Sequence, residues 1–490
     1  MRLRSLIITT LLFSILASCN NKKESDGAET VTAFINVNLV PMMAEVIVEN
    51  QTVLVAGERI TAIGPSDEVT MPENTAVIDG AGAYLMPGLA DMHMHTSDAW
   101  LTDDWPVSPL NLYLANGVTT IRDFETCGSD DLLVLRLREE IRKGSRDGLT
   151  MYTSGVILGG RRGLSTAFGT DDAQKIIHKL KDTGYDFVKL YSYVPEAKFY
   201  ELVAVAKQQD MYTAGHIPFA VGLDGVLSAG MDEIAHIEEL DWELYDFDRN
   251  QSLSSEEWFP YLVGVIKRQL APIDLDFKTF AEQKRETISQ IIKKLKLANI
   301  PICTNIVVSD IGVQKLFEPK AFLERPELKY YSRSYIDSFL RGKERHQLMF
   351  KGAEVFTLFK YEMDKMWLTE LKQAGIPLLL ATDGGSGLMG IVPGFSIHWE
   401  LQILVENGFT PYEAIATGTV NAAKVIEKMT GEEHFGTIEV GKRADLILVN
   451  GNPLKDVSNI RDLRGVMAAG RWYSRKKLEQ MIKDGGSGIE

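Results

Sequence analysis

The sequence predicts an α/β protein in which a TIM (β/α)8 barrel carries a small discontinuous β-sandwich domain built from both chain ends. In residues 86–430, eight short apolar runs rich in β-branched residues alternate with helical patterns, as in a parallel barrel. Two turn-rich segments, 31–85 and 431–478, flank this region. The chain has 490 residues, of which 45% are hydrophobic, and this is enough for a large core.

The first 18 residues have the pattern of an export signal. Arg2 and Arg4 precede the apolar run 6–17, which is too short to span a bilayer comfortably. The following "LASC" resembles the lipobox of bacterial lipoproteins, in which Cys19 would be lipidated. We therefore expect an exported protein that is lipid-anchored to a bacterial membrane, at the periplasmic face or the cell surface. An ordinary secretory signal is the alternative.

A tether and a β domain follow the predicted signal. The polar segment 19–30 is predicted to be the tether. In the segment 31–85, dense Val, Ile and Thr are punctuated by Gly and Pro, which is typical of short strands. Residues 431–478 have a similar composition and pattern, and a tail at 479–490 follows them. We expect these two segments to form one domain that the barrel interrupts.

The eight candidate barrel strands all lie between the two β-rich segments. They are 88–95, 117–124, 149–158, 185–192, 211–217, 232–237, 300–308 and 376–384. In such a barrel the active site lies where the strands end, at their carboxyl termini. Functional side chains are therefore expected in the last residues of these strands and just after them.

Two connections in the barrel are longer than the roughly 30 residues of an average strand–helix unit. They span residues 238–299 and 309–375 and are rich in aromatic and charged side chains. One interpretation is a lid or a substrate-specificity region. The other is an elaborated surface or a contact in a homo-oligomer. The sequence does not decide between them.

The net charge limits the kinds of partner that the protein can have, and the few cysteines limit its disulfide bonds. The net charge of −15 argues against nucleic acid, whose phosphates favour a basic surface. Apart from Cys19, the chain has only Cys127 and Cys303, which are too few and too far apart to define a disulfide framework. Both are expected to be buried free thiols. The expected partners are a small molecule and, through the N-terminal lipid, a membrane.

Four of the eight histidines and one aspartate fall at predicted strand ends. They are His93, His95, His216, His236 and Asp383. His93 and His95 are two residues apart, so that both imidazoles lie on one face of their strand. Each residue alone would more often be an ordinary core or surface residue. Together, imidazoles and a carboxylate at one barrel mouth are ligands for zinc or a similar divalent ion.

Lys189 stands in the apolar run "DFVKLYSY". Strand alternation puts Phe187, Lys189 and Tyr191 on one face, and Val188 and Leu190 on the other, toward the surrounding helices. An ammonium beside two cations would be disfavoured by desolvation and by like charge. A neutral amine can react with carbon dioxide to form a carbamate, an anion that can bridge two metals. A lysine that reaches solvent or pairs with an acid is the alternative.

This order of ligands resembles the amidohydrolase superfamily, in its two-metal branch with a carboxylated lysine. The segment "YLMPGLADMHMH" is similar to the family's opening motif, and "FTPYEAIATGTVNAAKVI" to the helix after its last barrel strand. The segment "GTIEVGKRADLILVNGNPLKDV" is similar to its return into the β domain. The resemblance covers about residues 31–478. Within this superfamily, the chain resembles imidazolonepropionase-like and prolidase-like hydrolases.

The resemblance implies two divalent ions, expected to be Zn²⁺, and the residues that hold them. It assigns the more buried metal to His93, His95 and Asp383. It assigns the second metal to His216 and His236. Lys189, as the carbamate, would bridge both ions together with a hydroxide.

The resemblance also implies a reaction, the hydrolysis of a C–N amide bond. The substrate would be a dipeptide, an N-acyl amino acid or a cyclic amide. The bridging hydroxide would attack the carbonyl, and Asp383 would carry the proton to the leaving group. Tyr191 is a candidate contact to the carbonyl oxygen, with simple packing as the alternative.

Two other functions stay open. Deaminases of heterocyclic bases in the same superfamily use one metal and carry a Glu just after the fifth-strand His, where this chain has Ile217 and Pro218. The lysine also favours hydrolysis over deamination. A non-catalytic, lipid-anchored binding protein on the same barrel is the third interpretation, although all the ligand positions are filled.

One segment departs from the relatives. Where they often have Gly-Gly-His-Gly, this chain has "GGRRG" at residues 159–163. Arg161 and Arg162 are candidates for binding a substrate carboxylate through their planar guanidinium groups. Pairing with an acid on a neighbouring loop is an equal alternative.

Overall fold

The computed structural model describes residues 31–160, 168–432 and 434–485. The predicted signal segment, Cys19, and the pair Arg161 and Arg162 lie outside these residues. Lipid anchoring and carboxylate binding by the arginine pair therefore stay predictions. Within the described residues, no helix combines the length and the apolar character needed to cross a membrane.

Both ends of the described chain contribute strands to one sheet. Its order is β17-β16-β15-β5-β1-β2-β3, and β4 pairs with β1. The strands come from residues 31–87 and 446–474: β1 (Val31–Leu39), β2 (Val48–Ala56), β3 (Arg59–Pro65), β4 (Ala76–Asp79), β5 (Tyr84–Pro87), β15 (Leu446–Val449), β16 (Leu463–Ala468) and β17 (Arg471–Ser474). The β domain is therefore discontinuous. Because these strands form one continuous sheet, the two-layer packing of a sandwich stays a prediction.

Two parallel sheets follow the chain order predicted for the barrel strands. A three-stranded sheet has the order β6-β7-β8, and a six-stranded sheet the order β14-β13-β12-β11-β10-β9. Their bounds are β6 (Leu89–Ser97), β7 (Val118–Cys127), β8 (Thr150–Thr153), β9 (Ile157–Leu158), β10 (Phe187–Leu190), β11 (Tyr212–Gly215), β12 (Glu233–Ile234), β13 (Ile302–Cys303) and β14 (Leu378–Leu379). Both β8 and β9 lie in the predicted strand 149–158.

Backbone hydrogen bonds connect the two parallel sheets beyond the regular ladders. The amide of Met92 on β6 donates to the carbonyl of Leu380, just after β14, at 2.9 Å. The amide of Asp383 donates to the carbonyl of His93 at 2.8 Å. The first predicted strand therefore lies beside the last one, as the strand order of a barrel requires.

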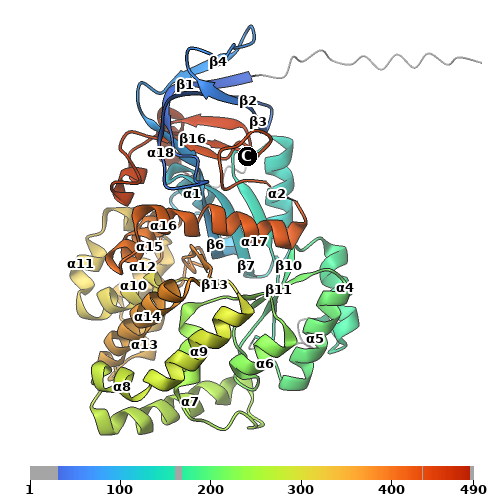
Figure 1. The fold of residues 1–490 in the computed structure, drawn as a ribbon. Coiled ribbons are helices and arrows are strands. Elements are labelled where there is room, and N and C mark those ends of the chain that lie inside the picture. Colours follow the sequence, from blue (N-terminus) through green and yellow to red (C-terminus); the bar gives the residue numbers. More distant parts are fainter. Residues whose placement is uncertain (1–30, 161–167, 433, 486–490) are drawn as a thin grey trace, which may run out of the picture.

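Helices surround these sheets and fill the connections between strands (Figure 1). In the first half they are α1 (Pro109–Ala115), α2 (Leu133–Lys143), α4 (Ala173–Thr183), α5 (Glu196–Gln208), α6 (Gly222–Ala229), α7 (Ser255–Leu270), α8 (Phe277–Gln283) and α9 (Arg285–Ala298). In the second half they are α10 (Val307–Phe317), α11 (Pro319–Leu323), α12 (Arg333–Leu340), α13 (Arg345–Met349), α14 (Val355–Ala374), α15 (Phe395–Glu406), α16 (Pro411–Thr417), α17 (Val420–Thr430) and α18 (Arg475–Lys483). The 3-10 helix η2 (Ile237–Leu244) follows β12 directly.

Side chains of β10 alternate between two hydrophobic clusters. Phe187 belongs to an interior cluster that includes Met92 of β6 and Phe124 of β7. Val188 and Leu190 belong to the larger cluster that contains most of the buried helical residues. The alternation predicted for this strand is therefore confirmed, and it places Lys189 on the interior side.

The predicted strand 300–308 is wrong in its second half. β13 ends at Cys303, and α10 begins at Val307. The buried carboxylate of Glu400 on α15 accepts hydrogen bonds from the backbone amides of Ile306 (3.1 Å) and Val307 (2.7 Å). Amides at a helix start lack partners within the helix, so this distant carboxylate stabilises a helix start that the local sequence does not signal.

The first long connection and part of the second form helical additions at the end of the molecule opposite the β domain (Figure 1). In Figure 1, α7, α8 and α9 of the first connection lie low in the view, and α13 and α14 of the second lie beside them. Residues of α14 contact η2, α8 and α9. The two additions therefore pack on each other and on the segment that follows β12.

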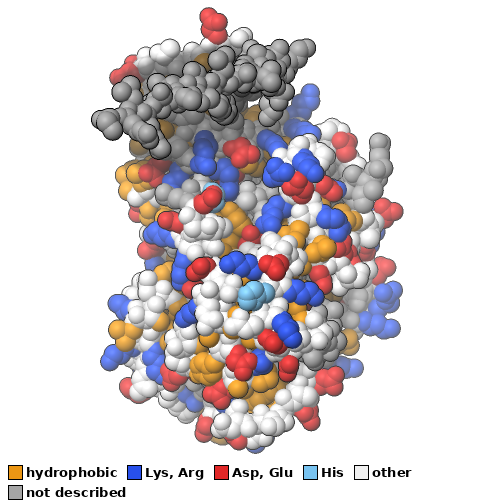
Figure 2. Space-filling view, turned by 90° about the vertical axis from the view of Figure 1, so that its right-hand side faces the viewer, with side chains coloured by type: hydrophobic (Ala, Val, Ile, Leu, Met, Phe, Trp, Pro, Cys, Tyr) orange, Lys and Arg blue, Asp and Glu red, His pale blue; other side chains and the backbone are white. Residues whose placement is uncertain are grey.

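Charged side chains are mixed over the face of the molecule that Figure 2 draws. Lys and Arg alternate with Asp and Glu among uncharged residues. On this face the described residues form no continuous basic surface of the kind that nucleic-acid phosphates favour.

Candidate active site

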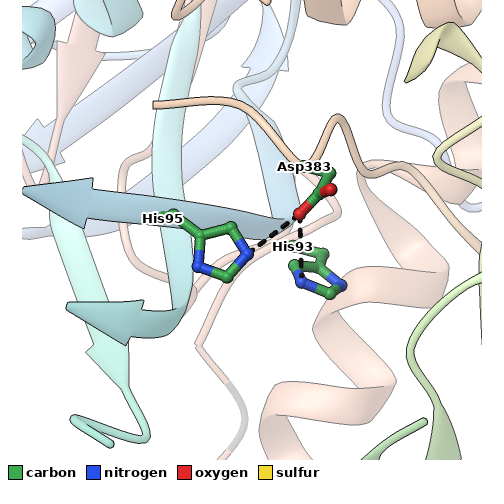
Figure 3. A group of neighbouring side chains, drawn as sticks. All are labelled: His93, His95 and Asp383. Atoms are coloured by element: carbon green, nitrogen blue, oxygen red, sulfur yellow. Dashed lines mark ion pairs between the residues drawn. The ribbon is translucent and has the colours of Figure 1, made fainter. Parts of the chain in front are cut away.

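His93, His95 and Asp383 come together where β6 ends and where the chain leaves β14 (Figure 3). The Oδ1 atom of Asp383 lies 2.9 Å from Nε2 of His95 and 3.5 Å from Nε2 of His93. One potential ligand atom from each residue lies within 4.8 Å of the other two, close enough to share one ion. The structure thus brings together the three residues assigned to the more buried metal.

Hydrogen bonds orient both imidazoles. Nδ1 of His93 lies 3.0 Å from the carbonyl oxygen of Ala235, and Nδ1 of His95 lies 3.3 Å from that of Glu125. A carbonyl can only accept, so each Nδ1 carries a proton, and Nε2 of the neutral His93 offers a lone pair. Nε2 of His93 is buried without a hydrogen-bond partner among the described residues. A metal would satisfy such an atom.

Asp383 has an unusual backbone conformation. Its φ is +57°, in the left-handed region that aspartate and asparagine tolerate better than most residues. The side-chain nitrogen of Asn305 donates to the carbonyl of Ala235 at 2.9 Å. The side-chain oxygen of Asn305 then accepts from the backbone amide of Asp383 at 3.1 Å. Asn305 therefore connects the aspartate to the segment that also orients His93.

His216 and His236 lie beside this group. The ring centroid of His236 is 4.4 Å from that of His93 and 4.8 Å from that of His216. Nδ1 of His216 contacts the carboxylate of Glu239, which also accepts from the amide of Ile217 at 3.0 Å. The Ser192 hydroxyl lies 3.1 Å from the same nitrogen. His216 is therefore held from its Nδ1 side, which leaves Nε2 for another ligand.

Burial sets the protonation of these histidines. It lowers the pKa of His93 and His216 well below the usual value and that of His236 to about 3, and the nearby Lys189 lowers all three further. These imidazoles are neutral at pH 7, which is the form that binds metals. Burial opposes charge on His95, but the hydrogen bond to Asp383 raises its pKa well above the usual value.

Lys189 is almost completely buried, with 1% of its surface exposed. Its Nζ atom has no hydrogen-bond partner among the described residues and lies 4.5 Å from the ring centroid of Phe124. Burial lowers its pKa to about 8, although Asp383 and Glu239 act in the opposite direction. Lys189 is neither exposed to solvent nor held in a direct ion pair with a described residue. The structure therefore shows neither of the two alternatives named for it, a lysine that reaches solvent and a lysine that pairs with an acid.

These groups open onto a cavity of about 760 Å³. Its walls include His95, Lys189, Tyr191, His216, His236 and Asp383. The two long connections supply much of the rest, with Trp242, Tyr245, Phe259 and Ile266 from the first and His346, Met349, Phe356 and Met363 from the second. This location favours a role in substrate specificity over a role confined to the outer surface.

Sequence reasoning missed several residues at this site. Cys127 was expected to be buried but is half-buried, lines the cavity, and groups with His95 and Glu125. Its position just after a predicted strand was the available signal. Cys303 is buried as predicted, and both cysteines are free thiols. Glu239 and Asn305 had no local signal, because their partners lie far away in the sequence.

Replacement of Glu239 with glutamine is expected to weaken metal binding by about 10- to 100-fold, because the carboxylate that orients His216 would be lost. Titration with Zn²⁺ under competition from a chelator measures this. The control is Glu243→Gln, which makes the same chemical change on a carboxylate that pairs with Arg249 instead. Equal affinities for Glu239→Gln and the wild type would contradict the positioning role.

Known proteins resemble this chain over part or most of its length. Residues 362–473 match the model of the Amidohydrolase family. The imidazolonepropionase of Pseudomonas savastanoi pv. phaseolicola is 23% identical over 419 residues, which cover 82% of this chain and 88% of that protein. The adenine deaminase of Staphylothermus marinus is 33% identical over 110 residues, which are 22% of this chain but only 17% of that protein.

Solved structures show the same fold. A Xaa-Pro dipeptidase with methionine bound in its active site superposes with a TM-score of 0.60 at 17% identity, over 91% of this chain and 100% of that one. Such neighbours imply a TIM barrel with an attached β domain. The chain is therefore similar to the Amidohydrolase family over residues 362–473 and, over most of its length, to an imidazolonepropionase.

Proposed function

We propose that this protein is a two-metal hydrolase that cleaves an amide C–N bond in a dipeptide, an N-acyl amino acid or a cyclic amide. The family match and the imidazolonepropionase relative support a hydrolase acting on C–N bonds. The observation that carries the proposal is the cluster of four histidines, Asp383 and the buried Lys189, of which all but His93 line one cavity. The matches to adenine deaminases are confined to short segments, such as the 110 residues shared with the enzyme from Staphylothermus marinus.

The side chains fit a pair of divalent ions. His93 presents a buried Nε2, and Lys189 presents a buried Nζ, and neither atom has a partner among the described residues. Nitrogen and carboxylate donors suit zinc. In the proposal, His93, His95 and Asp383 hold one ion, and His216 and His236 hold the other. The lowered pKa of Lys189 favours the neutral amine that carbamate formation requires, and the carbamate would bind both ions.

Bound divalent ions would polarise the scissile carbonyl and lower the pKa of a water molecule. The carboxylate of Asp383 is proposed to accept the proton of the attacking water and to deliver it to the leaving nitrogen. The hydrogen bond to His95 keeps the pKa of Asp383 well below its usual range against the effect of burial, so it begins as the anion. Burial raises the pKa of Tyr191, whose phenol therefore stays protonated and can donate to the substrate carbonyl oxygen.

A metal analysis combined with a substrate screen tests the proposal. We expect two divalent ions per chain and hydrolysis of at least one class among dipeptides, N-acyl amino acids and cyclic amides. The same preparation is offered adenine and cytosine, with release of ammonia as the readout. Ammonia release without amide hydrolysis would support deamination. A metal-free protein that hydrolyses nothing would support the non-catalytic binding protein.

A further inference from the structure

The cavity has a positively charged side chain whose role the proposed hydrolysis does not explain. Arg345 begins α13 in the second long connection, lines the cavity and is exposed. No hydrogen bond or ion pair joins its side chain to another described residue. The N–H donors of an unpaired guanidinium on the wall of a substrate cavity are free to bind a ligand. Their planar arrangement matches the two oxygen atoms of a carboxylate.

Arg345 lies close to the proposed catalytic groups. Among charged residues, it is the one that acts most strongly on the phenol of Tyr191, where it opposes the effect of burial. The ring of Tyr191 lies 4.2 Å from that of His216, between ring centroids. Arg345 and Tyr191 line the same cavity as His216 and Asp383, so that one small molecule in this cavity can contact both Arg345 and the proposed metal ligands.

The other basic residues on the cavity wall are less suitable. Lys360 is neutralised by Glu238 (2.6 Å) and Asp364 (2.8 Å). Lys189 belongs to the proposed metal pair. Lys267 and Lys351 are exposed lysines, each a flexible point charge without the planar donor set of an arginine.

The helix that carries Arg345 is held firmly in place. Glu344, directly before it, is buried and accepts from the amides of His346 (2.9 Å) and Gln347 (3.1 Å). The same carboxylate pairs with the buried Lys315 at 2.8 Å, and Lys315 also donates to the carbonyl of Met389 at 2.8 Å. A recognition residue next to such an anchor loses little backbone freedom when ligand binds.

A second group on α13 also points to a ligand at this wall. His346 is 6% exposed, lines the cavity, and has an Nδ1 atom without a hydrogen-bond partner among the described residues. Burial lowers its pKa well below the usual value, so it is a neutral group beside the permanent charge of Arg345. Around them the wall is apolar, with Met349 and Phe350 from the same segment.

We propose that Arg345 binds the carboxylate of the substrate, so that the enzyme acts on acidic amides, namely N-acyl amino acids and dipeptides with a free carboxyl end and an apolar side chain. This inference rests on the proposed function and assigns the recognition of its substrate to the second long connection. It differs from the role predicted for Arg161 and Arg162, which lie on another connection.

The test compares N-acetyl-L-phenylalanine with its carboxamide, and follows acetate release by the metal-loaded protein. We expect the wild type to prefer the acid. Arg345→Ala should lower kcat/KM for the acid by about 10- to 100-fold, mainly through KM, as expected for loss of a charged hydrogen bond. In Arg345→Ala, kcat/KM for the carboxamide should change less than about threefold. For the acid, kcat/KM of Arg345→Lys should lie between the values of the wild type and Arg345→Ala. The control Arg341→Ala removes the same charge from an exposed arginine that does not line the cavity.

Equilibrium binding of the same two compounds, measured by calorimetry, separates this inference from the proposed function. A protein that hydrolyses neither compound but binds the acid more tightly, with the preference lost in Arg345→Ala and kept in Arg341→Ala, would support the carboxylate site alone. Equal losses for acid and carboxamide in Arg345→Ala, or equal wild-type affinities for both, would overturn it while leaving amide hydrolysis untouched.

Discussion

Replacement of Lys189 with alanine is expected to lower kcat/KM for amide hydrolysis by about 1,000-fold, within the range for loss of a group that supports the nucleophile. The metal content should fall with it, because the carbamate would be the one protein ligand common to both ions. Plasma mass spectrometry of the purified variant measures the metal. Native mass spectrometry of the folded wild type, kept at neutral pH without acid, should show an added carbon dioxide, which is absent from the variant.

Chemical rescue makes this prediction specific. Acetate or propionate can occupy the space left by the lysine side chain and supply a carboxylate, so we expect them to restore part of the metal content and activity of Lys189→Ala. Lys189→Met is the matched control, because its side chain fills the same space and leaves no room for the acid. Normal metal content and activity in Lys189→Met would show that the lysine is not a ligand.

Replacement of Asp383 with asparagine is the second change with a large expected effect. The variant should lose about 100- to 10,000-fold in kcat, because the amide cannot accept and return the proton of the attacking water. Its stability should change little. Asparagine is nearly isosteric with aspartate and tolerates the left-handed backbone at φ +57°. Steady-state kinetics and urea unfolding measure the two quantities separately.

Two further variants serve as a comparison and a control for Asp383→Asn. Asp383→Ala should lose similar activity and, in addition, about 1 kcal/mol in the free energy of unfolding, because alanine is strained at positive φ. Asp248→Asn makes the same chemical change at an exposed residue and should leave kcat unchanged. Wild-type kcat in Asp383→Asn would remove the aspartate from the proposed proton transfer.

Several features of this protein could be predicted from the sequence because they depend on local periodicity. A repeat of two places Lys189 on one face of β10 and Val188 and Leu190 on the other, and the structure confirms this arrangement. The same repeat puts His93 and His95 together at the end of β6. The β-rich texture at both chain ends predicted a shared domain, and β5 pairs with β15 across the intervening barrel.

The metal-ligand assignment depended on more than periodicity. Position at predicted strand ends selected the four histidines and Asp383, and the resemblance to a known family supplied their division between two ions. The structure brings these residues together, and their role as ligands stays a proposal. Local patterns could suggest which residues meet at a barrel mouth because parallel strands end at the same side of a barrel.

Only the tertiary structure decided the surroundings of the site. Glu239 contacts His216 from 23 positions away, Glu400 fixes the start of α10 from more than 90 positions away, and Asn305 meets Asp383. A role of the two long connections in substrate specificity was one of two alternatives that the sequence left open, and nothing local singled out Arg345 within them. The physical reason is that periodicity reports which face of an element is apolar, whereas a polar partner is chosen by how elements pack. The sequence determined the order of the parallel strands and the candidate ligands at their ends, and packing decided what orients those ligands and what forms the cavity in front of them.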